Sequence, residues 1–88
     1  MIARYTNRSK GSTITLAHYK GASYAGLGHD TASADADCIK RIQNVWSVDG
    51  RAGLFGILSR DSALLPLVAP TATLPARAFA DLVRVATI

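Results

Sequence analysis

Acidic side chains are absent from the first third of this 88-residue chain. Residues 1–29 contain Arg4, Arg8, Lys10 and Lys20 but no acid, whereas residues 30–88 balance six basic side chains with six Asp. The formal net charge of +4 therefore belongs to the first third, which also holds all three Tyr and both His. A basic segment joined to a neutral body can dock on an acidic macromolecule.

Cysteine occurs only once, at Cys38, and this excludes an internal disulfide of the kind that stabilises small secreted domains. The chain shows no signal-peptide pattern, so we expect a cytoplasmic protein. Long apolar runs are also lacking. The longest uncharged run, residues 62–76, contains three Pro and is shorter than the roughly 20 residues that a membrane-spanning helix needs.

The composition predicts a small folded protein. A chain of 88 residues is expected to form a single domain over residues 1–88. Nearly half of the residues are apolar and only 18% are charged, which excludes disorder as the expected state. Because the chain has many Ala and only two Phe, we expect a thin, closely packed core.

Two strands are predicted at residues 1–8 and 13–20, since residues 13–16 alternate polar and apolar side chains. Residues 9–12 between them predict a hairpin loop in which Gly11 takes a positive φ. If Ile14 and Leu16 face the core, the outer face of the hairpin presents Arg4, Arg8, Thr15 and Tyr19. A turn at residues 20–22, a short strand at 23–25 and a loop at 26–28 are predicted to follow.

A helix is predicted over residues 32–48, where apolar residues recur at helical spacing: Ala34, Cys38, Ile39, Ile42, Val45 and Trp46. Thr31 or Ser33 can cap its start, and Gly50 can follow its end. We expect Cys38 and Trp46 to be core residues of this helix.

The remaining segments are apolar and interrupted by Gly and Pro. Residues 51–59 predict a buried strand because Gly53 and Gly56 disfavour a helix. Residues 63–68, interrupted by Pro66, predict an edge strand or an extended loop. A short helix is predicted after Pro75, with an apolar stripe of Phe79, Leu82, Val83 and Ala86 and with Arg77, Asp81 and Arg84 able to pair opposite it.

This order of elements predicts an α+β fold. The sheet is expected to be small and antiparallel, built from the N-terminal β-hairpin and one or two further strands. It is expected to pack against a central helix and a short C-terminal helix, with the helices on one face.

Signatures of catalysis and of metal binding are missing. His18, His29 and Cys38 do not have the spacing of a zinc site, and the Asp residues near position 30 lack the Gly and Glu of an EF-hand. No nucleophile, base and orienting group can be recognised together. We therefore expect a non-enzymatic protein with no catalytic residue, no metal and no cofactor.

The best candidate for function is partner binding through the basic N-terminal hairpin, by Arg4, Arg8, Lys10, Tyr19 and Lys20. The expected partner is a nucleic acid, a nucleoprotein or an acidic protein surface, not a membrane. Two alternatives remain open. One is a small basic ribonuclease of the toxin type that uses His18 as acid or base. The other is a structural subunit that oligomerises through residues 52–69.

The layout of the chain can also be compared with that of known proteins. The chain is small, its hairpin precedes its helix, and the start of the helix is rich in Ala and Asp. In these features the chain resembles small phage or mobile-element proteins that block host defence complexes, anti-CRISPR proteins among them. The resemblance implies an inhibitor that acts by binding. It includes no diagnostic motif and assigns no role to any residue.

Overall fold

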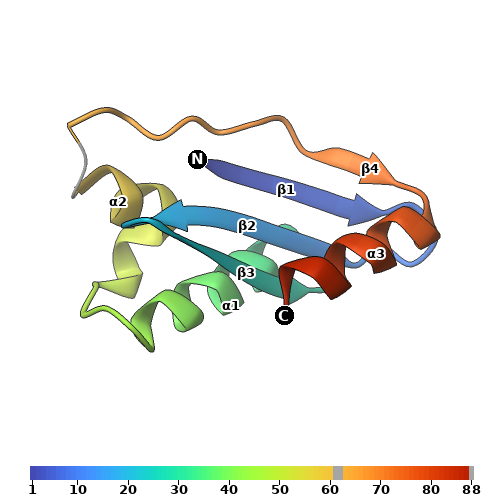
Figure 1. The fold of residues 1–88 in the computed structure, drawn as a ribbon, viewed down its shortest axis with the longest axis horizontal. Coiled ribbons are helices and arrows are strands. Elements are labelled where there is room, and N and C mark those ends of the chain that lie inside the picture. The colour runs from blue at the N-terminus through green and yellow to red at the C-terminus, as the bar shows by residue number, and fades with distance from the viewer. Residues whose placement is uncertain (61–62, 88) are drawn as a thin grey trace.

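The computed structural model describes residues 1–60 and 63–87 (Figure 1). The described residues form a four-stranded sheet of order β3-β2-β1-β4. Its strands are β1 (Ile2–Asn7), β2 (Thr13–Tyr19), β3 (Ala22–Gly28) and β4 (Ala72–Leu74). The first three pair antiparallel, whereas β4 pairs parallel with β1. The α+β class is confirmed, but the sheet is mixed, not wholly antiparallel.

The helices are α1 (Thr31–Gln43), the 3-10 helix η1 (Gly50–Ala52), α2 (Gly53–Arg60) and α3 (Ala76–Ala86). On β2, Ile14 packs with Phe79 of α3, whereas Ala17 packs with Cys38 of α1. Since Ile14 and Ala17 are three residues apart on a strand, they face opposite sides. Figure 1 accordingly shows α3 in front of the sheet and α1 behind it. The expectation that the helices share one face is wrong.

Both hairpins follow from their turn residues. Gly11 has a φ of +69° in the β1–β2 loop, as predicted, and the Asn7 side chain accepts a hydrogen bond from the backbone N–H of Ser9. The β2–β3 connection is shorter than predicted: only Lys20 and Gly21 form it, and both have positive φ. Two such residues are typical of a tight hairpin turn whose twist matches that of the strands.

Strand β3 extends through residues 26–28, which the sequence had indicated as a loop. Gly26 and Gly28 are needed for close approach of α1 and not for a turn. A Cβ atom at Gly26 would lie 2.2 Å from the Ala34 carbonyl oxygen, and one at Gly28 would lie 2.5 Å from Ser33 Cβ. Glycine in a strand often marks such an approach.

Helix α1 begins with an unexpected cap and ends earlier than predicted. Asp30, not Thr31 or Ser33, is the N-cap, and its carboxylate accepts a 2.7 Å hydrogen bond from the Ser33 N–H. The helix ends at Gln43, and Trp46 lies beyond it in a bend. Trp46 is half-buried against the core, so it is not the core residue of this helix that the sequence predicted. Gly50 does not follow its C-terminus but begins η1.

Residues 53–60 form helix α2 and not the predicted buried strand. Leu54, Ile57 and Leu58 are buried at the spacing of one helical face, and Gly53 stands at the first position. Glycine inside a helix costs about 1 kcal/mol, whereas each buried Leu or Ile side chain contributes roughly 1.5–3 kcal/mol. Tertiary burial therefore outweighs the local preference.

Residues 63–69 form an extended segment beside β1, in agreement with the second reading of this run. The Ile2 N–H donates to the Leu67 carbonyl at 2.8 Å, and the Ala69 N–H donates to the Ile2 carbonyl at 3.0 Å. Val68 thereby forms a parallel bridge with Ile2. The predicted helix after Pro75 is confirmed as α3.

Candidate partner-binding surface

Arg4, the first of the predicted binding residues, is used inside the molecule. Its Nε and Nη2 atoms donate to the two carboxylate oxygens of Asp35 at 3.0 and 2.8 Å. The buried Thr15 hydroxyl donates to the same carboxylate at 2.7 Å. The hydrogen bond to Asp35 raises the pKa of Arg4. This network joins β1 and β2 to α1, so Arg4 and Thr15 are not on the open face that the sequence predicted.

Tyr19 and Lys20 belong to an aromatic cluster. Tyr19 is buried and meets Trp46 edge-on, with the ring centroids 6.0 Å apart. Lys20 Nζ lies 4.3 Å from the Trp46 ring centroid, within the range of a cation–π contact. Trp46 Nε1 also donates to the Tyr24 hydroxyl at 3.0 Å. Burial leaves Tyr19 unable to offer its ring to a partner, contrary to the expectation.

The predicted binding residues are not brought together. Arg8 and Lys10 lie in the β1–β2 loop, whereas Lys20 lies in the β2–β3 turn at the other end of β2. A strand rises about 3.3 Å per residue, so the seven residues of β2 separate the two ends by roughly 20 Å. The expected single surface is thus divided among the hairpin loop, the Arg4 network and the aromatic cluster.

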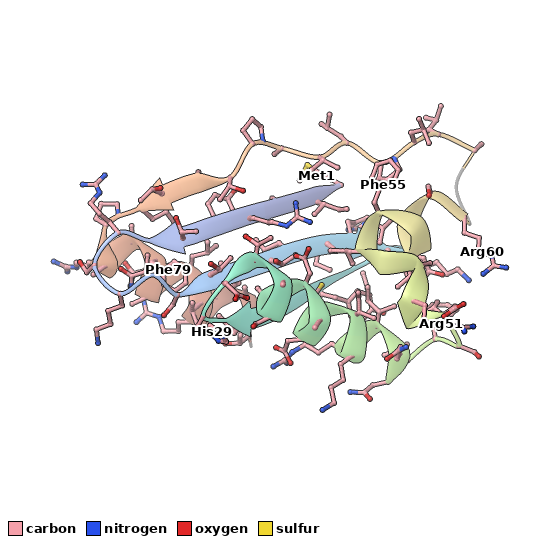
Figure 2. The ribbon with its side chains drawn as sticks, turned by 180° about the vertical axis from the view of Figure 1, so that it is seen from behind. Met1, His29, Arg51, Phe55, Arg60 and Phe79 are labelled. Atoms are coloured by element: carbon pink, nitrogen blue, oxygen red, sulfur yellow. The ribbon has the colours of Figure 1, made fainter. Side chains whose placement is uncertain are left out.

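A third cation lies on the helix that begins beside the β1–β2 loop. The backbone N–H of Arg8 donates to the Leu74 carbonyl at 2.8 Å, and α3 begins two residues after Leu74. Arg77 is exposed in the first turn of α3. We call Arg8, Lys10 and Arg77 the basic tip. Figure 2 shows Phe79 of α3 and His29 at this end of the sheet, with Met1 toward the other end.

Most other Arg residues of the protein form ion pairs with Asp side chains. Arg41 pairs with Asp37 and Arg51 pairs with Asp49, each at 3.2 Å. Asp81, which the sequence offered to both Arg77 and Arg84, pairs with Arg84 at 3.0 Å. Within residues 1–60 and 63–87, no carboxylate forms an ion pair with any residue of the basic tip.

The sequence alone did not associate Arg77 with the basic hairpin. It is 67 positions away from Lys10 along the chain, and only the parallel pairing of β4 with β1 places the start of α3 beside the hairpin. Pro75 predicted where this helix starts along the chain, but it did not predict where the helix lies in the fold. His29 and Asp30 also follow β3 at this end, with His29 Nε2 3.5 Å from an Asp30 carboxylate oxygen.

The His and Cys side chains that were considered for catalysis or metal binding do not form a common site. His18 is exposed on the Ile14 side of β2, and its Nδ1 is 3.4 Å from the Ser23 hydroxyl. Cys38 is fully buried, as predicted, and burial raises the pKa of its thiol to about 12. In the part of the chain that the structure describes, no three His, Cys or Asp side chains gather where they could hold a metal ion.

Apolar side chains form a second exposed surface. Leu64, Leu65 and Leu67 of the extended segment are 79%, 79% and 70% exposed. The apolar residues of α2 are instead mostly buried in the core. Of the predicted oligomerisation region, residues 52–69, mainly residues 63–69 are therefore seen to be open to a partner.

Comparisons of the chain with protein-family models, with curated proteins and with solved structures found no match. No function or residue role is therefore carried over from another protein. Among residues 1–60 and 63–87, no helix has the length and apolar character needed to cross a membrane.

Proposed function

We propose that this protein is a small non-enzymatic binding module that contacts an acidic macromolecule through the basic tip. The supporting observation is that Arg8, Lys10 and Arg77 project from two adjoining elements with no ion pair among the described residues. The partner is a nucleic acid, a nucleoprotein or an acidic protein surface. An inhibitor of the anti-CRISPR type, acting in the cytoplasm, would be one form of such a module.

The position of the tip supports binding by charge. Exposed Arg and Lys side chains attract phosphates and carboxylates, and a nucleic acid releases counterions when they bind. The tip is built on a hairpin loop that the Arg8–Leu74 hydrogen bond ties to β4, so little backbone order has to be gained on binding. Tyr19 and Tyr24 lie in the aromatic cluster, away from the tip, which argues against stacking of bases on these rings.

The test uses two double variants that remove one Arg and one Lys each. Arg8→Gln/Lys10→Gln changes the tip, whereas Lys40→Gln/Arg60→Gln lowers the net charge equally at exposed positions elsewhere. Binding to labelled single-stranded and duplex oligonucleotides and to an acidic peptide is measured by fluorescence anisotropy over a range of salt concentrations.

For a nucleic acid, the tip variant should lose about two units of the salt-dependence slope and roughly tenfold or more in affinity at low salt. Preference for the acidic peptide, with the same loss in the tip variant, would identify a protein partner. Equal losses in the two double variants would mean that overall charge and not the tip drives binding. Unchanged binding by the tip variant would overturn the proposal.

A further inference from the structure

One hollow adjoins the exposed leucines, and a second hollow shares Met1 and His18 with it as lining residues. The first, of about 380 Å³, lies between the end of β2 and the leucines of the extended segment. The second, of about 320 Å³, lies between the sheet and the C-terminal part of α3, where Leu16, Leu82 and Val85 line it. Because Met1 and His18 belong to both, the first hollow joins the leucines to the second hollow, and its own lining is partly polar, with His18 and Lys20.

The surface formed by the leucines and the two hollows exposes several large apolar side chains. Besides the three leucines, Val85 is 67% exposed and Met1 is 58% exposed. Soluble monomers rarely expose contiguous apolar patches beyond about 300–600 Å², and larger ones mark interaction sites. Helix α3 covers Ile14 through Phe79 but leaves the sheet near Met1 uncovered, so the surface is a consequence of the fold.

The backbone at this edge offers few donors to a further strand. Leu67 and Ala69 direct their hydrogen bonds to Ile2, and Pro66 and Pro70 on either side have no N–H to donate. On the opposite edge, the Leu27 N–H of β3 already donates to the Asp37 carboxylate at 2.9 Å. A partner is therefore expected to dock on the apolar side chains and not to extend the sheet.

We propose that a second copy of this chain covers the surface, forming a twofold dimer in which the leucines of each copy fill the second hollow of the other. A twofold interface requires one surface that is complementary to itself. This surface meets that requirement because it carries a protruding apolar ridge, Leu64, Leu65 and Leu67, beside an apolar hollow.

Charge opposes a second copy least at this place. Two chains of net charge +4 repel each other, and this repulsion is smallest where few charges lie. Among the described residues, Lys20 is the only Lys or Arg that lines either hollow, and no Asp does. The basic tip lies at the other end of β1, so each copy would keep its tip exposed in the dimer.

The size of the surface is near the lower limit for a dimer. Nine described residues line the first hollow and twelve line the second, with two shared. Standard interfaces use roughly 20–30 residues on each side. A dimer with two basic tips would also bind an extended acidic polymer more tightly than one copy, provided that the polymer spans both tips.

The oligomeric state tests the proposal. We expect light scattering coupled to size-exclusion chromatography to give twice the chain mass for the wild type. Leu65→Asp/Leu67→Asp should give the mass of one chain with an unchanged circular dichroism spectrum. Val45→Asp is the matched control, since Val45 is apolar and 63% exposed but lines neither hollow, and it should remain dimeric.

Cross-linking tests the arrangement. Chains with Leu65→Cys are mixed with chains with Val85→Cys, and a short thiol cross-linker should join the two kinds of chain. Chains with Val45→Cys replace one partner as the control and should not be joined. Cys38 is fully buried and should not compete for the reagent. A wild type that is monomeric at all concentrations, a double variant that stays dimeric, or absence of the 65–85 cross-link would overturn the proposal.

Discussion

Replacing Asp35 with Ala should show how strongly α1 depends on its polar contact with the sheet. The substitution removes the carboxylate that accepts two hydrogen bonds from Arg4 and one from Thr15. The Arg4 guanidinium would then be left without its acceptor at a position where its side chain is only 19% exposed. The fully buried Thr15 hydroxyl would lose its partner as well.

The expected loss follows from the burial of these groups. Removing one partner of a fully buried ion pair costs about 3–5 kcal/mol, and an exposed pair contributes only about 0–1 kcal/mol. About a fifth of each side chain is exposed here, so solvent screening lowers the ion-pair cost to roughly 2 kcal/mol. The unsatisfied Thr15 hydroxyl adds about 1 kcal/mol. We therefore expect a loss of about 3 kcal/mol from a total stability on the order of 5–15 kcal/mol.

Urea unfolding followed by Trp46 fluorescence and circular dichroism measures this loss. With a slope of about 1–3 kcal/mol per molar for a small protein, the midpoint should fall by about 1–3 M. Asp81→Ala is the control, because it breaks the exposed pair with Arg84 and should change stability by no more than about 0.5 kcal/mol. If Asp35→Ala costs as little as Asp81→Ala, the network does not hold α1 to the sheet.

Three further predictions concern the same helix. Gly26→Ala should lower the free energy of unfolding by at least about 3 kcal/mol in a denaturant melt. The added Cβ would lie 2.2 Å from the backbone atoms Ala34 O and Cys38 N, which cannot rotate away. A loss below about 1 kcal/mol would contradict the packing of β3 against α1. At about pH 8, a thiol reagent should label Cys38 only on unfolding, because burial raises its pKa to about 12, and rapid native labelling would refute this. The Leu27 N–H that donates to Asp37 lowers the pKa of the Asp37 carboxyl. The ionised carboxylate therefore stabilises the fold above the pKa of an unfolded Asp, and this stabilisation disappears as the pH falls from about 4 through the folded pKa. Asp37→Asn keeps an acceptor for Leu27 and should reduce this acid-induced loss; identical acid profiles for the variant and the wild type would contradict it.

The sequence predicted the fold correctly mainly where neighbouring residues decide the local structure. Gly11 indicated the first hairpin loop, and Pro75 with the stripe around Phe79 indicated α3. The buried position of Cys38 followed from helical spacing. The candidate binding surface was predicted less well. Arg8 and Lys10 lie exposed at the hairpin loop as expected, but Arg4 and Tyr19 are turned into the protein.

What the sequence by itself determined are the features set by short-range effects: the first hairpin loop with Gly11, the periodicity of α1 and α3, and the excess of basic residues in the first third. The tertiary structure alone decided that residues 53–60 form a helix, because burial of Leu54 and Ile57 outweighs the preference of Gly56. It also decided that, among the described residues, no carboxylate forms an ion pair with the basic tip. Asp35 reaches Arg4 across 31 positions, while the parallel pairing of β4 with β1 carries Arg77 to the hairpin. Such pairings depend on distances in space between residues far apart in the chain, and local patterns of sequence do not contain them.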